Sequence, residues 1–189
     1  MELLEQRILK DGKVLPGGIL KVDSFLNHQM DPELLYEMGR ELGRLFADSG
    51  VNKILTIEAS GIAIAVMAGL VFRCPVVFAK KSKTKNISDS LYQVQVESFT
   101  HGNTNTVVVS KEYLKPGDRV LIVDDFLATG AALVGLKNLA EQAGARVVGA
   151  GIAVEKVFQG GGDKLRSQGL RVESLARIAE MSDDGLRFC

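Results

Sequence analysis

The stretch VLIVDDFLATG, residues 120–130, decides how this chain is expected to fold. Four apolar residues lead into two adjacent acids, Asp124 and Asp125, and a Thr-Gly turn follows before a helical pattern begins at Ala131. A continuous apolar run is typical of a parallel strand that is buried on both faces. In open α/β sheets, ligands bind beyond the carboxyl ends of such strands. The pattern therefore predicts that both aspartates lie where a ligand binds.

The turn after the two acids has the features of a phosphate-binding loop. It opens a helix, and the first backbone N–H groups of a helix have no partner inside it, so they suit a phosphate. The residues of this turn are Ala128, Thr129, Gly130, Ala131 and Ala132. Carboxylates for sugar hydroxyls beside amides for a phosphate predict a ribose 5-phosphate site. The alternative is an exposed acidic turn that merely closes a core strand.

The rest of the chain alternates between patterns typical of strands and of helices. Strands are predicted over 53–57, 75–79, 146–154 and 171–178, besides the one that begins at Val120. Helices are predicted over 2–10, from Pro32 until Gly50, and over 62–72, 131–143 and 163–167. Segments 94–99 and 104–110 alternate enough to pair as a hairpin, and 19–29 is expected to be irregular and extended. The alternation predicts an α/β fold with a mainly parallel central sheet flanked by helices.

Length and composition limit the class of protein. The 189 residues are 46% hydrophobic, and Lys plus Arg equals Asp plus Glu at 23 each, so nothing global recruits nucleic acid or a membrane surface. We expect one domain over residues 1–189. The apolar stretch 62–72 is shorter than the roughly 20 residues that span a bilayer, and the N-terminus lacks a signal-peptide pattern. Two cysteines and two histidines without ligand spacing predict a cytoplasmic protein that builds no metal site of its own.

In its order of strand, acid pair and phosphate-type turn, the stretch 120–130 resembles the signature of the type I phosphoribosyltransferases, which bind 5-phosphoribosyl 1-pyrophosphate (PRPP). The resemblance implies the fold of that family, in which a small hood and a flexible hairpin loop join the central sheet. The hood would comprise residues 1–30 plus a C-terminal part, and the loop about residues 80–102. The resemblance also implies that Asp124 and Asp125 are catalytic and that 128–132 bind PRPP.

A second strand-to-helix turn matches the pyrophosphate loop of the same family. It consists of Glu58, Ala59, Ser60 and Gly61, and the helix start again offers backbone amides to an anion. By itself this match is weak, because any turn of this kind can carry Gly and Ser. Lys81, or its neighbour Lys80, would balance the pyrophosphate charge, whereas Lys83 and Lys85 are expected to be solvated. The family closes its flexible loop over the substrates to exclude water.

Lys156 is the candidate residue for recognition of the base. Strand alternation puts it on the same side as Val154, with Glu155 opposite. In purine members of the family a lysine here donates to the 6-oxo group of the base. An ammonium only donates, so it favours a 6-oxopurine over adenine, whose 6-amino group is itself a donor. The alternative is a surface lysine at a strand end.

The resemblance extends over nearly the whole chain and is narrower than the family. Segments 20–29, 58–61, 124–130, 155–156 and 172–178 resemble the bacterial members that act on xanthine. This implies that Leu20 and Asn27 belong to the xanthine pocket, where the Asn27 amide offers both a donor and an acceptor. It also implies transfer of the 5-phosphoribosyl group to N9 of xanthine in purine salvage, by a homodimer. Mg²⁺ would be held mainly through PRPP oxygens.

The sequence leaves the general base and two rival functions open. Some 6-oxopurine enzymes carry an aspartate where this chain has Ala128, so the base is unassigned: xanthine reacts as an anion, or Glu97 assists. The first rival is a guanine, hypoxanthine or adenine phosphoribosyltransferase, and Lys156 argues against adenine. The second is a PRPP-sensing purine regulator that binds DNA. The early start of the fold and the zero net charge argue against it.

Overall fold

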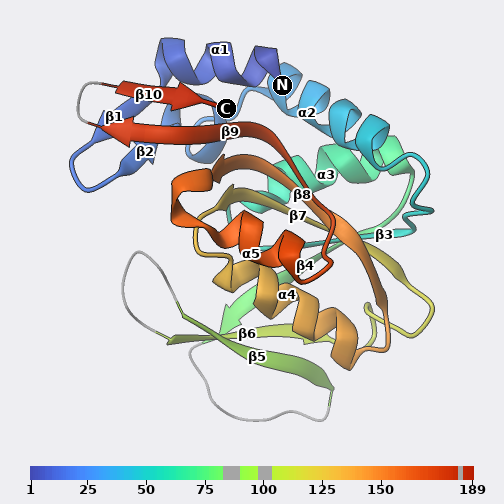
Figure 1. Ribbon diagram of the computed structural model, residues 1–189. Coiled ribbons are helices and arrows are strands. Elements are labelled where there is room, and N and C mark those ends of the chain that lie inside the picture. Colours follow the sequence, from blue (N-terminus) through green and yellow to red (C-terminus); the bar gives the residue numbers. More distant parts are fainter. Residues whose placement is uncertain (83–89, 98–103, 183–184) are drawn as a thin grey trace.

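A central β-sheet organises the molecule, which is described here from a computed structural model covering residues 1–82, 90–97, 104–182 and 185–189 (Figure 1). Within these residues the strands of this sheet are β3 (Lys53–Ile57), β4 (Val76–Ser82), β5 (Leu91–Glu97), β6 (Thr104–Ser110), β7 (Arg119–Leu127), β8 (Arg146–Lys156), β9 (Val172–Ser182) and β10 (Gly185–Phe188). Their order in space is β10-β9-β8-β7-β3-β4-β6-β5. The five inner strands from β9 to β4 pair in parallel, while β10, β6 and β5 add antiparallel edges. The predicted α/β class with a mainly parallel sheet is confirmed.

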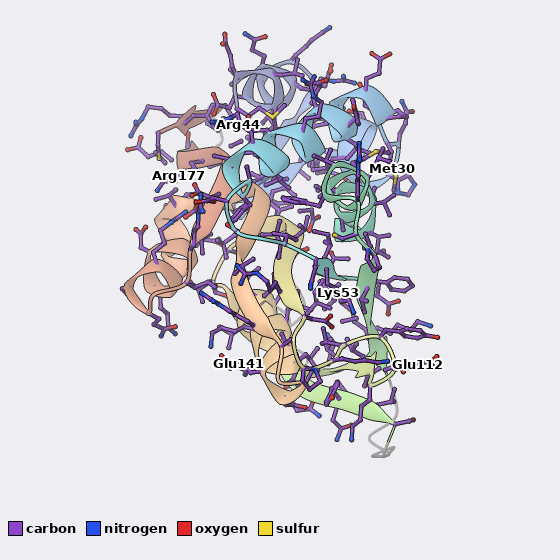
Figure 2. All side chains as sticks on the ribbon, turned by 90° about the vertical axis from the view of Figure 1, so that its right-hand side faces the viewer. Met30, Arg44, Lys53, Glu112, Glu141 and Arg177 are labelled. Carbon is purple, nitrogen blue, oxygen red and sulfur yellow. The ribbon has the colours of Figure 1, made fainter. Side chains whose placement is uncertain are left out.

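Helices cover both faces of this sheet, which explains the continuous apolar run of β7. The helices are α1 (Glu2–Asp11), α2 (Pro32–Leu45), α3 (Gly61–Phe72), α4 (Ala131–Gln142) and α5 (Gly161–Ser167). Figure 1 shows α2 and α3 on one side of the sheet and α4 on the other. Leu121 and Val123 are buried in the core with α2 and α3, whereas Val120 and Ile122 are buried with α4. Charged side chains such as Arg44 on α2 and Glu141 on α4 point outward (Figure 2).

Helix α2 begins at Pro32, as predicted, and ends earlier than expected. The Asp31 side chain accepts a hydrogen bond from the Leu34 N–H at 3.2 Å, and Pro32 occupies the first helical position. The helix was expected to run until Gly50 but stops at Leu45, because Phe46 leaves the helical conformation and is fully buried. The Arg171 guanidinium lies 4.6 Å from the centre of the Phe46 ring and covers it.

The predicted loop over 80–102 is wrong at its start. Lys80, Lys81 and Ser82 continue β4 and pair with Val108, Val107 and Thr106 of β6. Both lysine side chains are exposed, so this segment lacks the apolar pattern of a buried strand. Its backbone is nevertheless hydrogen-bonded to β6. The predicted hairpin is confirmed, and it begins earlier, with Leu91 opposite Ser110. Residues 83–89 and 98–103, which include Lys83, Lys85 and the predicted turn, lie outside the described residues.

The two ends of the chain meet at one end of the molecule. Residues 19–29, expected to be irregular, contain β2 (Ile19–Lys21), which pairs with β1 (Lys13–Leu15), and then a π-helical turn over Asp23–Asn27. The turn between β1 and β2 needs positive φ at Gly17 and Gly18. Strand β10, which the sequence patterns did not predict, extends β9 beside α1 and this hairpin (Figure 1). No helix of the described residues is long and apolar enough to cross a membrane.

Candidate active site

A cavity of about 490 Å³ opens at the carboxyl ends of β3, β7 and β8. Fifteen residues that the sequence nominated for substrate contact line it, whereas the alternative lysine, Lys80, does not: Leu20, Asn27, Glu58, Ala59, Ser60, Gly61, Lys81, Asp124, Asp125, Ala128, Thr129, Gly130, Ala131, Ala132 and Lys156. Carboxyl ends of parallel strands meet at the same sheet edge, so segments far apart in sequence converge there. The structure thus brings the nominated residues together, while their individual roles stay predictions.

The acid pair combines one buried and one more accessible carboxylate. Asp124 is only 5% exposed, and its Oδ1 accepts a hydrogen bond from the Asp125 N–H at 3.0 Å. Burial, followed by repulsion from the Asp125 carboxylate, raises the pKa of Asp124 well above its ordinary value. The nearby positive charge of Lys81 opposes this shift but does not cancel it. A ligand that brings positive charge beside Asp124 would therefore stabilise its ionised form, which burial disfavours.

The turn between β3 and α3 lies directly against the acid pair. A Cβ atom placed on Gly61 would come 2.9 Å from Asp124 Oδ1, so only glycine leaves room here. On the other side, Glu58 Oε1 accepts a hydrogen bond from the Lys81 N–H at 2.6 Å, which ties this turn to the end of β4. The peptide bond between Glu58 and Ala59 is cis. The turn, the acids and Lys81 therefore form one continuous wall.

The segment 128–132 presents free backbone donors to the same cavity. Helix α4 begins at Ala131 after Gly130, whose φ is +88° and which has no side chain to cap the helix. The Val134 N–H is the first to return to the Gly130 carbonyl, at 3.0 Å. The preceding N–H groups of a helix start are the orphan donors that bind anions. This geometry can hold a phosphate without any basic side chain.

The opposite end of the cavity carries polar groups suited to a flat base. Lys156 Nζ donates to the Gly18 carbonyl at 2.9 Å and lies 5.6 Å from the centre of the Phe126 ring. Burial lowers the pKa of Lys156. The Oδ1 atom of Asn27 is buried and has no hydrogen-bond partner among the described residues. A buried orphan acceptor is costly unless a ligand or water pairs it, so Asn27 is ready to receive a donor. Leu20, 6% exposed, adds apolar wall.

Sequence reasoning missed several residues of this cavity. Phe126 lies two positions after Asp124, so the period-2 rule for strands would have placed it on the same face. The Gly17-Gly18 dipeptide is a turn signal and also went unused. Asn105 and Val96 reach the cavity from the β5–β6 hairpin, and no local pattern announces that approach.

Comparison with known proteins identifies the class. The model of the phosphoribosyl transferase domain matches residues 36–170. The chain therefore belongs to the phosphoribosyltransferase family, and the resemblance seen in its sequence is confirmed. It is 55% identical over 188 residues to the xanthine phosphoribosyltransferase of Finegoldia magna, covering 100% of this chain and 99% of that relative. It is 53% identical to the xanthine phosphoribosyltransferase of Lactobacillus delbrueckii subsp. bulgaricus, covering 100% of both chains.

Solved structures agree on the fold. The adenine phosphoribosyltransferase of Trypanosoma brucei, determined in complex with AMP, pyrophosphate and ribose-5-phosphate, superposes with a TM-score of 0.78. The match covers 96% of this chain and 82% of the other, at 16% sequence identity. At that identity the likeness concerns the fold alone and carries no information on the base.

Proposed function

We propose that this enzyme transfers the 5-phosphoribosyl group of PRPP to N9 of xanthine, giving xanthosine 5′-monophosphate and pyrophosphate in purine salvage. The observation that carries the proposal is the convergence of an acid pair, two amide-lined turns and Lys156 on one cavity. Full-length identity above 50% to relatives named for this reaction supports the choice of base. In this proposal the 5′-phosphate, the ribose, the pyrophosphate and the base each contact a different group of cavity residues.

The mechanism follows from where charge changes. N9 forms a bond to C1 of the ribose while the bond from C1 to the pyrophosphate oxygen breaks, through a transition state with oxocarbenium character. Asp124 and Asp125 hold the ribose hydroxyls and stabilise the developing positive charge. The N–H groups of 128–132 bind the 5′-phosphate, while 58–61 and Lys81 receive the pyrophosphate. The proton of N9 either leaves for solvent before transfer, when xanthine reacts as an anion, or passes to Glu97, whose side chain lies outside the described residues.

Base selection rests on the polar groups at the far end of the cavity. The Lys156 ammonium donates to the 6-oxo group, and the Asn27 amide pairs an oxo group and a ring N–H of xanthine. The unpaired Oδ1 of Asn27 supports this, since a ring N–H would satisfy it. Adenine would present its 6-amino donor to an ammonium that accepts nothing. The pocket therefore suits a 6-oxopurine.

We propose Mg²⁺ as the metal that accompanies PRPP. The cavity offers the hard oxygen donors Glu58, Asp124 and Asp125, which fit this ion. Within the described part of the chain, however, no three metal-binding side chains gather into a cluster. PRPP oxygens would therefore supply most of the ligands. When bound, the ion neutralises the pyrophosphate as it leaves.

A pyrophosphate-release assay with PRPP, Mg²⁺ and each of xanthine, guanine, hypoxanthine and adenine tests the function. We expect xanthine to have the highest kcat/KM, by at least about tenfold over adenine, because one mismatched polar contact costs that much or more. A preference for adenine would overturn the assigned base. Absence of turnover with every purine, together with salt-dependent DNA binding, would point to a regulator instead.

We also propose a cytoplasmic homodimer that associates through the face carrying α3. Val66 and Leu70, one helical turn apart on α3, are 48% and 63% exposed, and Phe78 of β4 is 41% exposed. Phe78 shares a sheet face with Val76, which packs against the core beneath α3. Exposed apolar patches of this kind mark interfaces, and symmetric dimers are the commonest assembly.

Sedimentation velocity measures the proposed association. The wild type should sediment as a dimer, and Leu70→Lys should shift it toward monomer, because a charge in an apolar interface is left unpaired. Lys115→Glu, a charge change at an exposed position elsewhere, is the matched control and should stay dimeric. A monomeric wild type at working concentration would contradict the proposal.

The domain organisation is part of the same proposal. Residues 1–189 form one phosphoribosyltransferase domain, in which residues 1–30 and the C-terminal strands act as the hood. The position of α1, the β1–β2 hairpin, β9 and β10 at one end of the molecule supports this reading (Figure 1). The bond from Lys156 to Gly18 joins the hood to the end of β8.

A further inference from the structure

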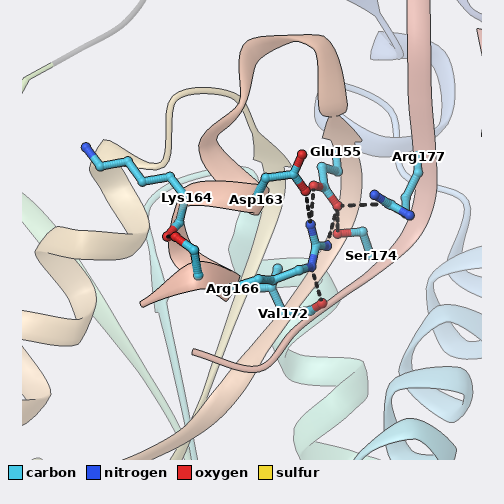
Figure 3. Close-up of polar contacts among 8 residues, drawn as sticks. Glu155, Asp163, Lys164, Arg166, Val172, Ser174 and Arg177 are labelled. Carbon is cyan, nitrogen blue, oxygen red and sulfur yellow. Dashed lines mark hydrogen bonds and ion pairs between the residues drawn. The ribbon is translucent and has the colours of Figure 1, made fainter. Parts of the chain in front are cut away.

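Glu155 is a buried carboxylate that lies outside the cavity. It is 0% exposed and lies near the end of β8, on the face opposite to Lys156. Arg166 donates from Nη1 and Nη2 to its two oxygens, each at 2.7 Å, and Ser174 Oγ donates at 2.6 Å (Figure 3). Arg177 Nε adds an ion pair at 3.4 Å. Burial raises the pKa of Glu155, but the bonds from Arg166 and Ser174 outweigh burial and lower it, so the carboxylate is charged.

This ion pair holds α5 in one position. Arg166 belongs to α5, and its Nε also donates to the Val172 carbonyl of β9 at 3.1 Å. A planar guanidinium that makes two parallel bonds to a carboxylate fixes both distance and orientation. Gly162, in the first turn of α5, leaves no room for a side chain, because its Cβ would overlap Glu155 Oε1. The carboxylate therefore sets how closely α5 approaches β8.

The first turn of α5 in turn supports the phosphate-binding segment. The Gly161 N–H donates to the Ala128 carbonyl at 3.1 Å. A Cβ on Gly161 would lie 2.5 Å from the carbonyl carbon of Thr129 and 2.7 Å from the nitrogen of Gly130. Leu165, 2% exposed, fills the space below Gly130. The turn over 128–130 thus rests directly on α5, backbone against backbone.

We propose that Glu155 and Arg166 are positioning residues for the 5′-phosphate of PRPP. Their ion pair fixes α5, and α5 fixes the backbone amides of 128–132. This inference rests on the proposed function, in which those amides hold the 5′-phosphate. The base meets Lys156 and Asn27, neither of which touches α5 by a hydrogen bond among the described residues. Loosening α5 should therefore weaken PRPP binding and spare xanthine binding.

Arg166→Lys tests the proposal, because lysine keeps the charge but loses the two parallel bonds. We expect the KM for PRPP to rise about tenfold or more, since small displacements of binding groups cost this much. The KM for xanthine should change less than about twofold, because the base end keeps its contacts. Arg187→Lys is the control: Arg187 makes the exposed pair with Glu180 at 2.8 Å, far along the chain from the phosphate turn.

Two readouts separate positioning from stability. A merely structural role would lower the melting temperature of Arg166→Lys and leave both KM values unchanged well below it, which would overturn the proposal. If Arg166→Lys fails to fold, Gly161→Ala replaces it, because this change presses on the phosphate turn while the ion pair is retained. It should show the same selective rise in the KM for PRPP, and an unchanged value would again overturn the proposal.

Equilibrium binding of ribose 5-phosphate distinguishes this inference from the proposed function. The sugar phosphate needs no base and no turnover, so its affinity reports the phosphate turn even if xanthine were the wrong substrate. Weaker binding to Arg166→Lys than to wild type supports the inference whichever purine reacts. Equal affinity of the two proteins would remove Glu155 and Arg166 from substrate positioning while leaving the proposed reaction intact.

Discussion

Replacing both Asp124 and Asp125 by asparagine should abolish phosphoribosyl transfer while the fold persists. The amides keep the shape of the acids but lose the negative charge that stabilises an oxocarbenium-like transition state. Loss of one preorganised electrostatic contact costs about 10²- to 10³-fold in kcat, so we expect at least about 10³-fold for the pair. Pyrophosphate release from PRPP with xanthine measures the loss. Asp48→Asn, whose side chain is 83% exposed, is the matched control and should stay active.

Unfolding by denaturant at several pH values checks that the double variant is folded. The direction in which the free energy of unfolding changes with pH follows from the pKa of Asp124. The native pKa of Asp124 is raised above 3.8. Between pH 3.8 and the native pKa, the native protein therefore keeps a proton on Asp124 that the unfolded chain has released. The contribution of Asp124 to the free energy of unfolding is therefore largest below pH 3.8 and falls as pH rises through the native pKa. The double variant has no buried carboxylate at position 124 to ionise as pH rises, so at neutral pH its free energy of unfolding should be at least that of wild type. A folded variant that still transfers the phosphoribosyl group at the wild-type rate would contradict the assignment of these acids.

Lys156→Met should reduce kcat/KM for xanthine by about ten- to a hundredfold, the usual value of a hydrogen bond to a charged group. Methionine keeps the apolar stem that packs near Phe126 but removes the donor to the 6-oxo group. Activity with adenine, which gains nothing from an ammonium, should change much less, so the preference for xanthine should narrow. Steady-state rates with the four purines give both numbers.

Two results would count against this role for Lys156. Unchanged selectivity in Lys156→Met would remove the lysine from base recognition. An equal loss with every purine would indicate that the bond from Lys156 to the Gly18 carbonyl supports the cavity as a whole. Lys115→Met, at an exposed position, is the control and should keep the wild-type preference.

The sequence by itself determined the central sheet and the location of the site. A strand such as Val120–Val123 must bury both faces, and its apolar run says so without any knowledge of neighbours. The acids and the two Gly-containing turns follow strand ends, and parallel strands bring their carboxyl ends to one edge. Local pattern and the geometry of parallel sheets therefore suffice to gather these residues around one cavity.

Only the tertiary structure decided the contacts that depend on distant partners. Strand alternation placed Glu155 opposite Lys156 and did not show that it is buried, which is possible because Arg166 and Ser174, 11 and 19 residues further on, supply its hydrogen bonds. Lys80 and Lys81 looked like loop residues, yet β6 offers their backbone a partner. Sequence periodicity does not show whether a charged side chain will have an ion-pair partner. That depends on which segments lie side by side in the completed sheet.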